Sequence, residues 1–414
     1  PTWNVSGAWN AHEEKFFSNL TSVLSHFTLK ASYSLTADRG PADVTNSQAI
    51  ITSYSPYRPF TSIQESGLYI KELENSELTY EKKHELNIGA DMGFLNNRIN
   101  LAVDWYKRNN YDLIGIVNTQ GAGGQILKYA NIASMKSHGI EFTLSTKNIK
   151  TKDFNWNTDF IFSNAKNEVT DLKQNANVME LISGNGFAKQ GYPVRGLFSI
   201  PFVGLDKDGI PVIINEKGEA TSTDINFQER QNTGFLKYEG PTDPTITGSL
   251  GNMFSYKGFR LNLFITYSFG NVIRLNPVFK AYYSDLTAMT REFKNRWTLP
   301  GDEAKTNVPA ILSKRMYDSN EDLKYAYNAY NYSTERIAKG DFIRLKEISL
   351  AYDFPKAWIN PLKLTDLSLK VQATNLFLIY ADDKLNGQDP EFFNAGGVAS
   401  PVPRQFTITL RLGL

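Results

Sequence analysis

The 414 residues include no cysteine and only four histidines. Without cysteine, the chain can hold no disulfide, zinc–thiolate site, iron–sulfur cluster or thiol nucleophile, and the absence of thiols suits an oxidising compartment. The histidines, His12, His26, His84 and His138, are far apart in the sequence. That spacing disfavours a histidine-rich metal site.

The chain also lacks an apolar run of the roughly 18 residues that a spanning helix needs, and its mean hydropathy is −0.36. A membrane-spanning β-barrel remains possible, because its strands carry polar residues at alternate positions. The net charge of +1, from 44 basic and 43 acidic residues, disfavours nucleic acid as a partner. Aromatic residues make up 13% of the chain, which suits strands and membrane-interface belts.

The dominant hydrophobic period is two, which indicates strands. In the last ten residues, Phe406, Ile408 and Leu410 fall on one face, and Thr407, Thr409 and Arg411 on the other. About a dozen segments share this alternation: 2–12, 26–37, 82–95, 97–116, 126–149, 154–170, 192–204, 244–257, 258–274, 341–355, 366–380 and 403–414. Many have the roughly ten residues that a tilted membrane-spanning strand needs, so the sequence predicts an all-β transmembrane antiparallel barrel.

The connections alternate between tight and long. Asn96-Asn97, Lys257-Gly258 and Lys150 to Asp153 are short, whereas 38–81, 173–191, 205–243, 275–340 and 381–402 are long and irregular. Short turns at one rim and long loops at the other are typical of outer-membrane barrels. Within one loop, Phe279, Tyr282, Leu286, Met289, Phe293 and Trp297 recur at three- and four-residue steps and predict an amphipathic helix.

Residues 1–414 show no linker or repeat, so we expect a single domain with no internal boundary. Pro1 stands where an initiator Met or a signal peptide would be expected, which favours a downstream part of a longer protein. A sheet can cross a bilayer only if it closes. If this chain is part of a larger barrel, its two edge strands must pair with strands outside this sequence.

Several stretches, read together, resemble one known family. They are the E-K-x-x-x-x-N-x-G-x-D hairpin of residues 81–91, the segment from Asn131 to Glu141, the R-W-T-x-x-G-D loop of residues 296–302, the strand KGDFIRLKEISLAYDFP, the G-x-D-P-E loop of residues 387–391 and the closing strand PVPRQFTITLRLGL. The chain resembles the C-terminal part of the SusC/RagA-type TonB-dependent outer-membrane transporters of Bacteroidetes. It departs from the family at Ala133, where Gly is usual, at Leu35 to Asp38, and at the terminal Leu414, where Phe is common.

The resemblance implies about half of a twenty-two-stranded barrel in the outer membrane of a Gram-negative bacterium, surrounded by lipid and lipopolysaccharide. It implies import of oligosaccharides or oligopeptides beneath a SusD/RagB-like lipoprotein lid, driven by TonB–ExbB–ExbD. The family's plug domain and TonB box have no counterpart in this sequence, so no residue here is assigned to energy coupling.

Two aromatic clusters are candidate contacts for cargo. Tyr325, Tyr327, Tyr330 and Tyr332 lie near Asn328 and Asn331, and a second cluster holds Tyr54, Tyr57, Arg58 and Phe60. Tyrosine rings beside amides suit stacking on sugars, peptide contact or a protein interface. The alternative is that these loops pack on their neighbours or on the lid.

Charged residues on the polar faces of the strands are candidates for lining the lumen, although most of them would serve the plug and water. They are Glu85, Asp91, Arg98, Asp104, Glu141, Asp159, Arg260 and Arg411.

Other patterns have a plainer interpretation. Asp206-x-Asp208-Gly209 lacks the rest of a calcium loop and reads as an Asp-Gly turn. Asp382, Asp383, Asp389 and Glu391 could chelate a hard cation, but a solvated acidic loop is the default. Gly121-Ala122-Gly123-Gly124 lacks the Lys-Ser/Thr of a phosphate loop.

No catalytic motif, cofactor site or metal site is predicted. The absence of such motifs disfavours an enzyme without excluding one, and the resemblance implies a transporter. A structural barrel subunit of a larger outer-membrane complex, without active transport, is the main alternative, and a soluble carbohydrate-binding β protein is a third.

Overall fold

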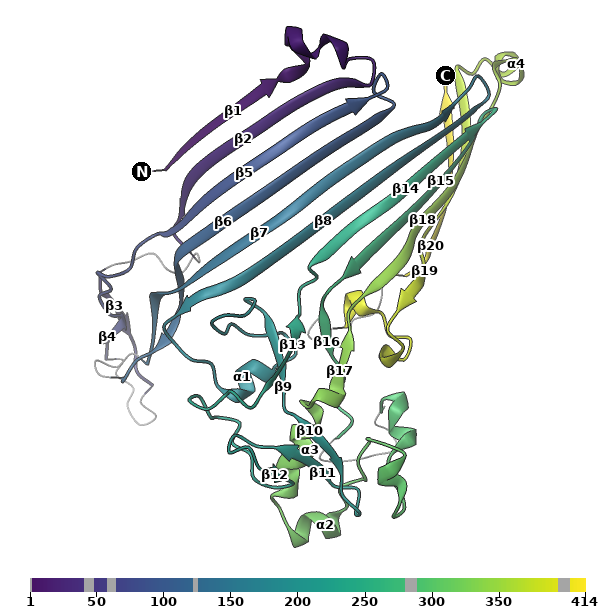
Figure 1. Ribbon diagram of the computed structural model, residues 1–414. Helices are drawn as coiled ribbons and strands as arrows, with labels where there is room; N and C mark the ends of the chain where they lie inside the picture. Colours follow the sequence, from purple (N-terminus) through teal and green to yellow (C-terminus); the bar gives the residue numbers. More distant parts are fainter. Residues whose placement is uncertain (1, 41–47, 58–64, 122–125, 280–288, 394–402) are drawn as a thin grey trace.

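The computed structural model describes residues 2–40, 48–57, 65–121, 126–279, 289–393 and 403–414. One antiparallel sheet of eleven strands dominates it and forms a long, curved, tilted wall (Figure 1). In spatial order the strands are β1 (Trp3–Asn10), β2 (Leu24–Asp38), β5 (Glu81–Phe94), β6 (Ile99–Asn118), β7 (Leu127–Lys150), β8 (Phe154–Leu172), β14 (Ile246–Tyr256), β15 (Phe259–Phe269), β18 (Phe342–Asp353), β19 (Asp366–Ala381) and β20 (Gln405–Gly413). The predicted antiparallel barrel wall is confirmed.

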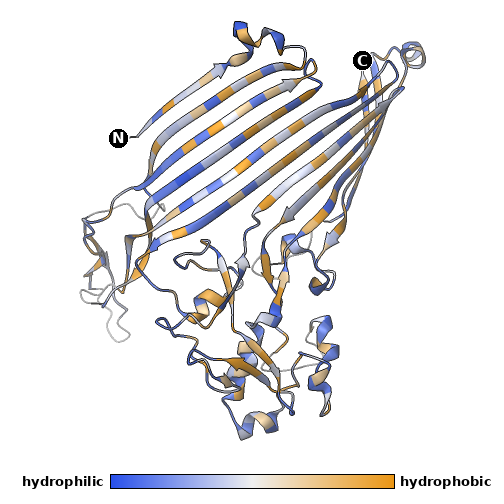
Figure 2. Cartoon of the chain, viewed as in Figure 1, coloured by the Kyte–Doolittle hydropathy of each residue, from blue (hydrophilic) through white to orange (hydrophobic). Residues whose placement is uncertain are grey.

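The register of the sheet gathers the apolar residues on one face. Directly paired residues share a face, and one such row runs Trp9, Leu29, Ala90, Val103, Phe142 and Phe162 across six strands. Figure 2 shows the resulting alternation of apolar and polar residues along the strands. We call these two surfaces the apolar face and the polar face.

Tight turns join the strands at one rim, which we call the short-turn rim. Asn96 and Asn97 both have positive φ, as do Lys257 and Gly258. Two consecutive residues with positive φ match the right-handed twist of a hairpin. The predicted tight turns are therefore confirmed. The same rim carries the short helices η1 (Ala11–Glu13), η2 (Lys15–Asn19), α4 (Lys356–Ile359) and η6 (Asn360–Leu362).

The long connections leave the opposite rim, which we call the long-loop rim. The sequence had suggested that these connections are irregular, but they contain secondary structure of their own (Figure 1). The strands there are β3 (Ile50–Tyr54), β4 (Gly67–Glu72), β9 (Gly196–Ser199), β10 (Phe202–Leu205), β11 (Pro211–Ile214), β12 (Ala220–Thr221), β13 (Lys237–Pro241), β16 (Val272–Arg274) and β17 (Ile337–Lys339). The helices are α1 (Val178–Ile182), η3 (Arg291–Asn295), η4 (Asp302–Ala304), α2 (Lys314–Ser319), α3 (Leu323–Asn331), η5 (Thr334–Arg336), η7 (Asp383–Leu385) and η8 (Pro390–Phe392).

Two sequence predictions change in the loops. The segment 192–204 is not a strand of the wall: β9 and β10 form two small separate sheets, and Pro201, which has no backbone N–H to donate, stands between them. The predicted amphipathic helix falls largely on residues 280–288, outside the described residues, and the part after them contains only the short helix η3. No helix in the described part of the chain is long and apolar enough to cross a membrane.

The side chain of one tyrosine packs across a facing glycine and so links three strands of the wall. Tyr267 on β15 lies opposite Gly248 on β14, and its hydroxyl donates to the backbone oxygen of Ile161 on β8 at 2.8 Å. A Cβ at position 248 would lie 2.1 Å from that oxygen and 2.3 Å from the tyrosine hydroxyl. Glycine at this position therefore leaves the room that the ring needs.

We expect Gly248→Ala to lower the free energy of unfolding by about 1–3 kcal/mol, the usual range for overpacking. Gly251→Ala on the same strand is the matched control, because a Cβ there would meet nothing closer than 3.6 Å. Urea unfolding of both variants checks this, and equal midpoints for the two would contradict it.

Candidate functional site

The β8–β14 and β15–β18 connections pack together beside the wall, and we call them the loop cluster, whereas the connection that carries β3 and β4 lies apart from them (Figure 1). The loop cluster contains a hydrophobic core whose buried residues come from the β8–β14 connection and from α3. These residues are Ala176, Val178, Leu181, Ile182, Phe198, Ile200, Ile213, Leu236 and Ala329. Because α3 belongs to the β15–β18 connection, the shared core holds two long loops together.

Arg274 on β16, within the β15–β18 connection, links that connection to the β8–β14 connection by hydrogen bonds. Its guanidinium donates to the backbone oxygens of Phe198 at 2.6 Å, Ser333 at 2.9 Å and Ile182 at 3.2 Å. Burial lowers the pKa of Arg274 to about 9, and the nearby Glu239 carboxylate acts in the opposite direction. The guanidinium thus stays charged at neutral pH, and charge-assisted hydrogen bonds to backbone oxygens are among the stronger kind.

Two further buried arginines hold the loops: Arg336 within the β15–β18 connection, and Arg344 between a loop and the wall. Arg336 pairs with Glu292 and donates to the backbone oxygen of Asn276 at 2.8 Å. Arg344 on β18 pairs with Asp389, and also with Glu391 at 3.4 Å. The β19–β20 connection is therefore fastened directly to a strand of the wall.

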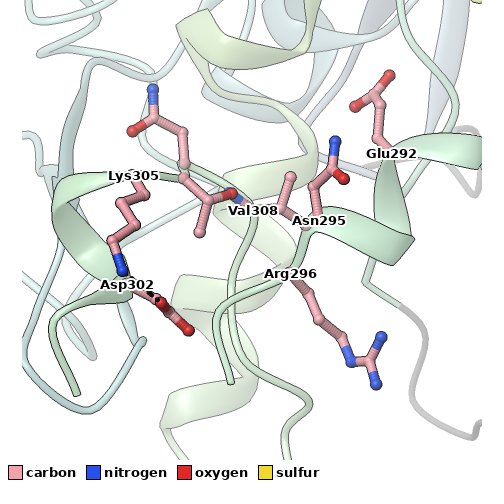
Figure 3. A pocket seen from close by; sticks show the side chains of 8 residues that line it. Glu292, Asn295, Arg296, Asp302, Lys305 and Val308 are labelled. Carbon is pink, nitrogen blue, oxygen red and sulfur yellow. Dashed lines mark hydrogen bonds and ion pairs between the residues drawn. The ribbon is translucent and has the colours of Figure 1, made fainter. Parts of the chain in front are cut away.

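An open, polar pocket of about 470 Å³ lies in the β15–β18 connection (Figure 3). It is lined by Glu292, Asn295, Arg296, Asp302, Lys305, Thr306, Asn307 and Val308. Hydrogen bonds from the backbone N–H of Leu299 and from Thr298 lower the pKa of Asp302. The lining thus offers amides, a hydroxyl and charges of both signs, a set suited to reversible binding of a polar ligand by hydrogen bonds.

Three residues of the first predicted aromatic cluster lie on α3, and Tyr332 follows the end of that helix. Tyr327 and Tyr330 are each 1% exposed, and their ring centroids lie 5.2 Å from that of Phe279 and 5.4 Å from that of Phe202 respectively. Burial raises the pKa of Tyr330 to about 12. Tyr332 is half-buried beside the Arg274 guanidinium, whereas Tyr325 is 40% exposed. The four rings therefore do not form one surface.

The sequence interpretation treated this segment as a loop and missed the helix. Leu323, Ala326, Tyr327 and Tyr330 recur at helical steps and are among the residues that α3 buries. This spacing was the signal that could have revealed the helix.

The second aromatic cluster is more open. Tyr54 on β3 makes an edge-to-face contact with Tyr69 on β4, with ring centroids 5.4 Å apart, and Tyr57 is 90% exposed. Arg58 and Phe60 lie outside the described residues.

Most of the predicted lumen residues lie on the polar face and have partners there. Asp91 pairs with Lys30 at 2.6 Å, Glu85 with Arg108 at 3.0 Å, and Arg260 with Asp353 at 2.7 Å. Asp104 and Glu141 face each other in register, Asp159 accepts a hydrogen bond from Ser145, and Arg411 lies 3.9 Å from Asp366. Arg98 differs, because it lies in the turn before β6 and donates to the backbone oxygens of Lys147 and Asn148.

The acidic motifs make local hydrogen bonds. Asp206 accepts from the backbone N–H groups of Asp208 and Ile210, and Gly209 has positive φ, so the predicted Asp-Gly turn is confirmed. Asp382 caps η7, and Asp389 both caps η8 and pairs with Arg344. Within the described ranges, no group of three or more His, Asp or Glu side chains could hold a metal ion.

We expect Asp389→Asn to loosen the β19–β20 connection, because it removes the charge that compensates a 6% exposed arginine. Breaking a buried ion pair costs about 3–5 kcal/mol. Asp353→Asn is the control, since its pair with Arg260 is about half exposed and is worth about 0–1 kcal/mol. Hydrogen exchange over residues 382–393 should rise in the first variant only, and equal protection in both variants would refute the role of Arg344.

Comparison with known proteins identifies relatives over nearly the whole chain, although no protein-family model matches it. TonB-dependent receptor P3 of Formosa agariphila is 25% identical over 404 residues, which covers 93% of this chain and 37% of the receptor. TonB-dependent receptor SusC of Bacteroides thetaiotaomicron is 26% identical over 433 residues, which covers 98% of this chain and 39% of SusC. The chain thus spans about two fifths of the length of these relatives.

Solved structures show the same fold. The RagAB peptide importer in its open-open state matches 100% of this chain and 42% of its own, with a TM-score of 0.77 and 23% identity. The structure of the RagAB peptide transporter matches 99% of this chain and 43% of its own, with a TM-score of 0.76 and 24% identity. The resemblance to SusC/RagA-type TonB-dependent receptors is therefore confirmed, in the sequence over nearly the whole chain and in the fold of the barrel wall.

Proposed function

We propose that this chain forms part of the wall and the loop cluster of an outer-membrane importer for oligosaccharides or oligopeptides. One observation carries the proposal: an antiparallel wall with a single apolar face bears its longest loops, which contain strands and helices of their own, at one rim. The apolar face suits lipid, and the loop cluster with its polar pocket suits capture of a polar cargo. RagAB, whose fold this chain shares, is a peptide transporter, which supports the same class of activity.

The proposed mechanism is binding and gated passage, in which no covalent bond is made or broken. A SusD/RagB-like lipoprotein would close over the loop cluster, and TonB–ExbB–ExbD would supply energy through a plug domain. This chain supplies the loops that meet the cargo and the polar face that lines its path. Residues 1–414 act as one domain in this account, because Arg344 fastens the β19–β20 connection to the wall.

Closure of the barrel is part of the proposal. Among the described residues, β1 pairs only with β2, and β20 pairs only with β19. In lipid the outer edges of these strands need partners for their backbone N–H and C=O groups. Further strands, about as many again, would complete a barrel of twenty-two.

The experiment is uptake by a bacterium that expresses the intact protein, measured with separate fluorescent pools of oligosaccharides and oligopeptides. We expect gene deletion to abolish uptake of one pool, and a protonophore to do the same, since TonB draws on the proton gradient. If deletion changes neither pool but alters the composition of an envelope complex, the structural-barrel alternative replaces this proposal.

Among the predicted contact residues, the exposed rings are the ones that we propose meet the cargo or the lid. Ala substitutions at Tyr54, Tyr57 and Tyr325 should each lower uptake by about two- to tenfold, the worth of one aromatic contact. Tyr256→Ala is the control, because that ring is similarly exposed but lies at the opposite rim. Unchanged uptake in all three variants would remove these residues from the proposal.

A further inference from the structure

The short-turn rim carries a concentration of positive charge. Arg98, Lys147, Lys150, Lys152 and Lys257 are all exposed in or beside the turns of three consecutive hairpins, and Asp153 is the one acidic residue in those turns. None of the four lysines forms an ion pair with a described residue. We call these five cationic residues the basic rim.

Backbone hydrogen bonds hold the three hairpins together. The N–H of Lys147 donates to the oxygen of Arg98 at 2.8 Å, and the N–H of Lys257 donates to the oxygen of Asp153 at 3.2 Å. The ammonium of Lys257 lies 5.3 Å from the ring centroid of Tyr256, a residue on the apolar face. The positive charge of the basic rim thus extends to the edge of the surface that would meet lipid.

A chain of hydrogen-bonded polar side chains interrupts the apolar face just inside this rim. Thr146 donates to Asn148 at 2.8 Å, Asn148 to Thr158 at 2.7 Å, and Thr158 to Asn252 at 2.7 Å. Trp156 also donates to Asn252, at 2.9 Å. We call these five residues the polar chain. In register, Thr146, Thr158 and Asn252 form one row across β7, β8 and β14.

Apolar residues lie on both sides of the polar chain. The next row away from the rim is Leu144, Phe160 and Leu250, and Trp156 pairs with Phe254 in the row toward the rim. Polar groups among apolar residues raise the free energy of the folded state unless they have hydrogen-bond partners. The four hydrogen bonds between its side chains satisfy most donors and acceptors of the polar chain, but not all of them.

The amide nitrogen of Asn252 is the group left over. Indole N–H can only donate, so the Asn252 atom that faces Trp156 must be the oxygen, and this orients the amide. That oxygen also accepts from Thr158, whereas the amide nitrogen has no partner among the described residues. It can therefore donate to an acceptor that comes from outside the chain.

We propose that the polar chain and the basic rim together bind an anionic phospholipid of the leaflet beside the short-turn rim. The lysines attract the phosphate, the Asn252 amide donates to an ester or phosphate oxygen, and Phe160, Leu250 and Phe254 contact the acyl chains. Tyr256 lies four positions after Asn252 on a tilted strand, which is about 10 Å along the membrane normal. Lysine side chains and a headgroup can bridge this distance. Charge complementarity selects an anionic over a zwitterionic lipid.

This inference rests on the proposed membrane location, so the test separates the two. The intact protein is reconstituted into vesicles of equal parts phosphatidylglycerol and phosphatidylcholine. Failure to float with the vesicles would contradict the membrane location itself. For protein that floats, extraction into detergent and mass spectrometry of the co-purifying lipid give the ratio of the two lipids.

We expect phosphatidylglycerol to be enriched several-fold over the input ratio. Each lysine removed should weaken the binding of phosphatidylglycerol by about fivefold at low salt, so that Lys150→Ala, Lys152→Ala and Lys257→Ala together abolish the enrichment. The matched control combines Lys207→Ala, Lys237→Ala and Lys314→Ala, which removes the same charge from the loop cluster. Recovery of both lipids in the input ratio, or equal enrichment in the two triple variants, would overturn the site.

A second variant tests the polar chain without a change of charge. Asn252→Leu should reduce the enrichment, whereas Asn262→Leu, one strand away on the polar face, should not. If Asn252→Leu retains the full enrichment, the basic rim acts alone and the assignment of Asn252 is wrong.

Discussion

The need to pair every backbone N–H and C=O group governs this molecule. A wall in lipid has no water to satisfy those groups, so each strand must be bonded along its whole length. Antiparallel pairing across eleven strands meets this need along the wall, apart from local bulges and the outer edges of β1 and β20. The bulges in the longer strands occur mostly toward the loops, for example between Asn110 and Leu113 on β6. The wall is therefore the rigid part on which the rest depends.

The loops solve a different problem, because they must stay ordered without a continuous sheet. They do so with two small hydrophobic cores and three buried arginines, each of which reaches backbone oxygens or carboxylates from distant parts of the chain. Arg274 joins residues 182, 198 and 333, which no local pattern connects. Such fastening leaves other side chains of the loops, such as the exposed Tyr57, available for contact with a ligand.

The sequence was sufficient to predict features that depend on near neighbours. Strand positions follow from alternation, as in β20, and the tight turns follow from residues that tolerate positive φ, as at Asn96 and Asn97. The same reasoning could not place Tyr327 and Tyr330, because their burial depends on Phe279 and Phe202, which are far from them in the sequence. Nor could it connect Trp156 with Asn252, whose contact spans 96 residues. The candidate site was harder to predict than the fold for this reason.

The most direct test of the central claim, that this sheet is a membrane wall with one face in lipid, is cysteine scanning along β19. The 414 residues contain no cysteine, so substituted positions are the only thiols in this part of the protein. Leu367, Leu369 and Val371 lie on the apolar face, and Ser368, Lys370 and Gln372 on the polar face. In intact outer membranes, a water-soluble maleimide should label Ser368→Cys, Lys370→Cys and Gln372→Cys and spare the other three, whereas labelling with no period of two would contradict the account.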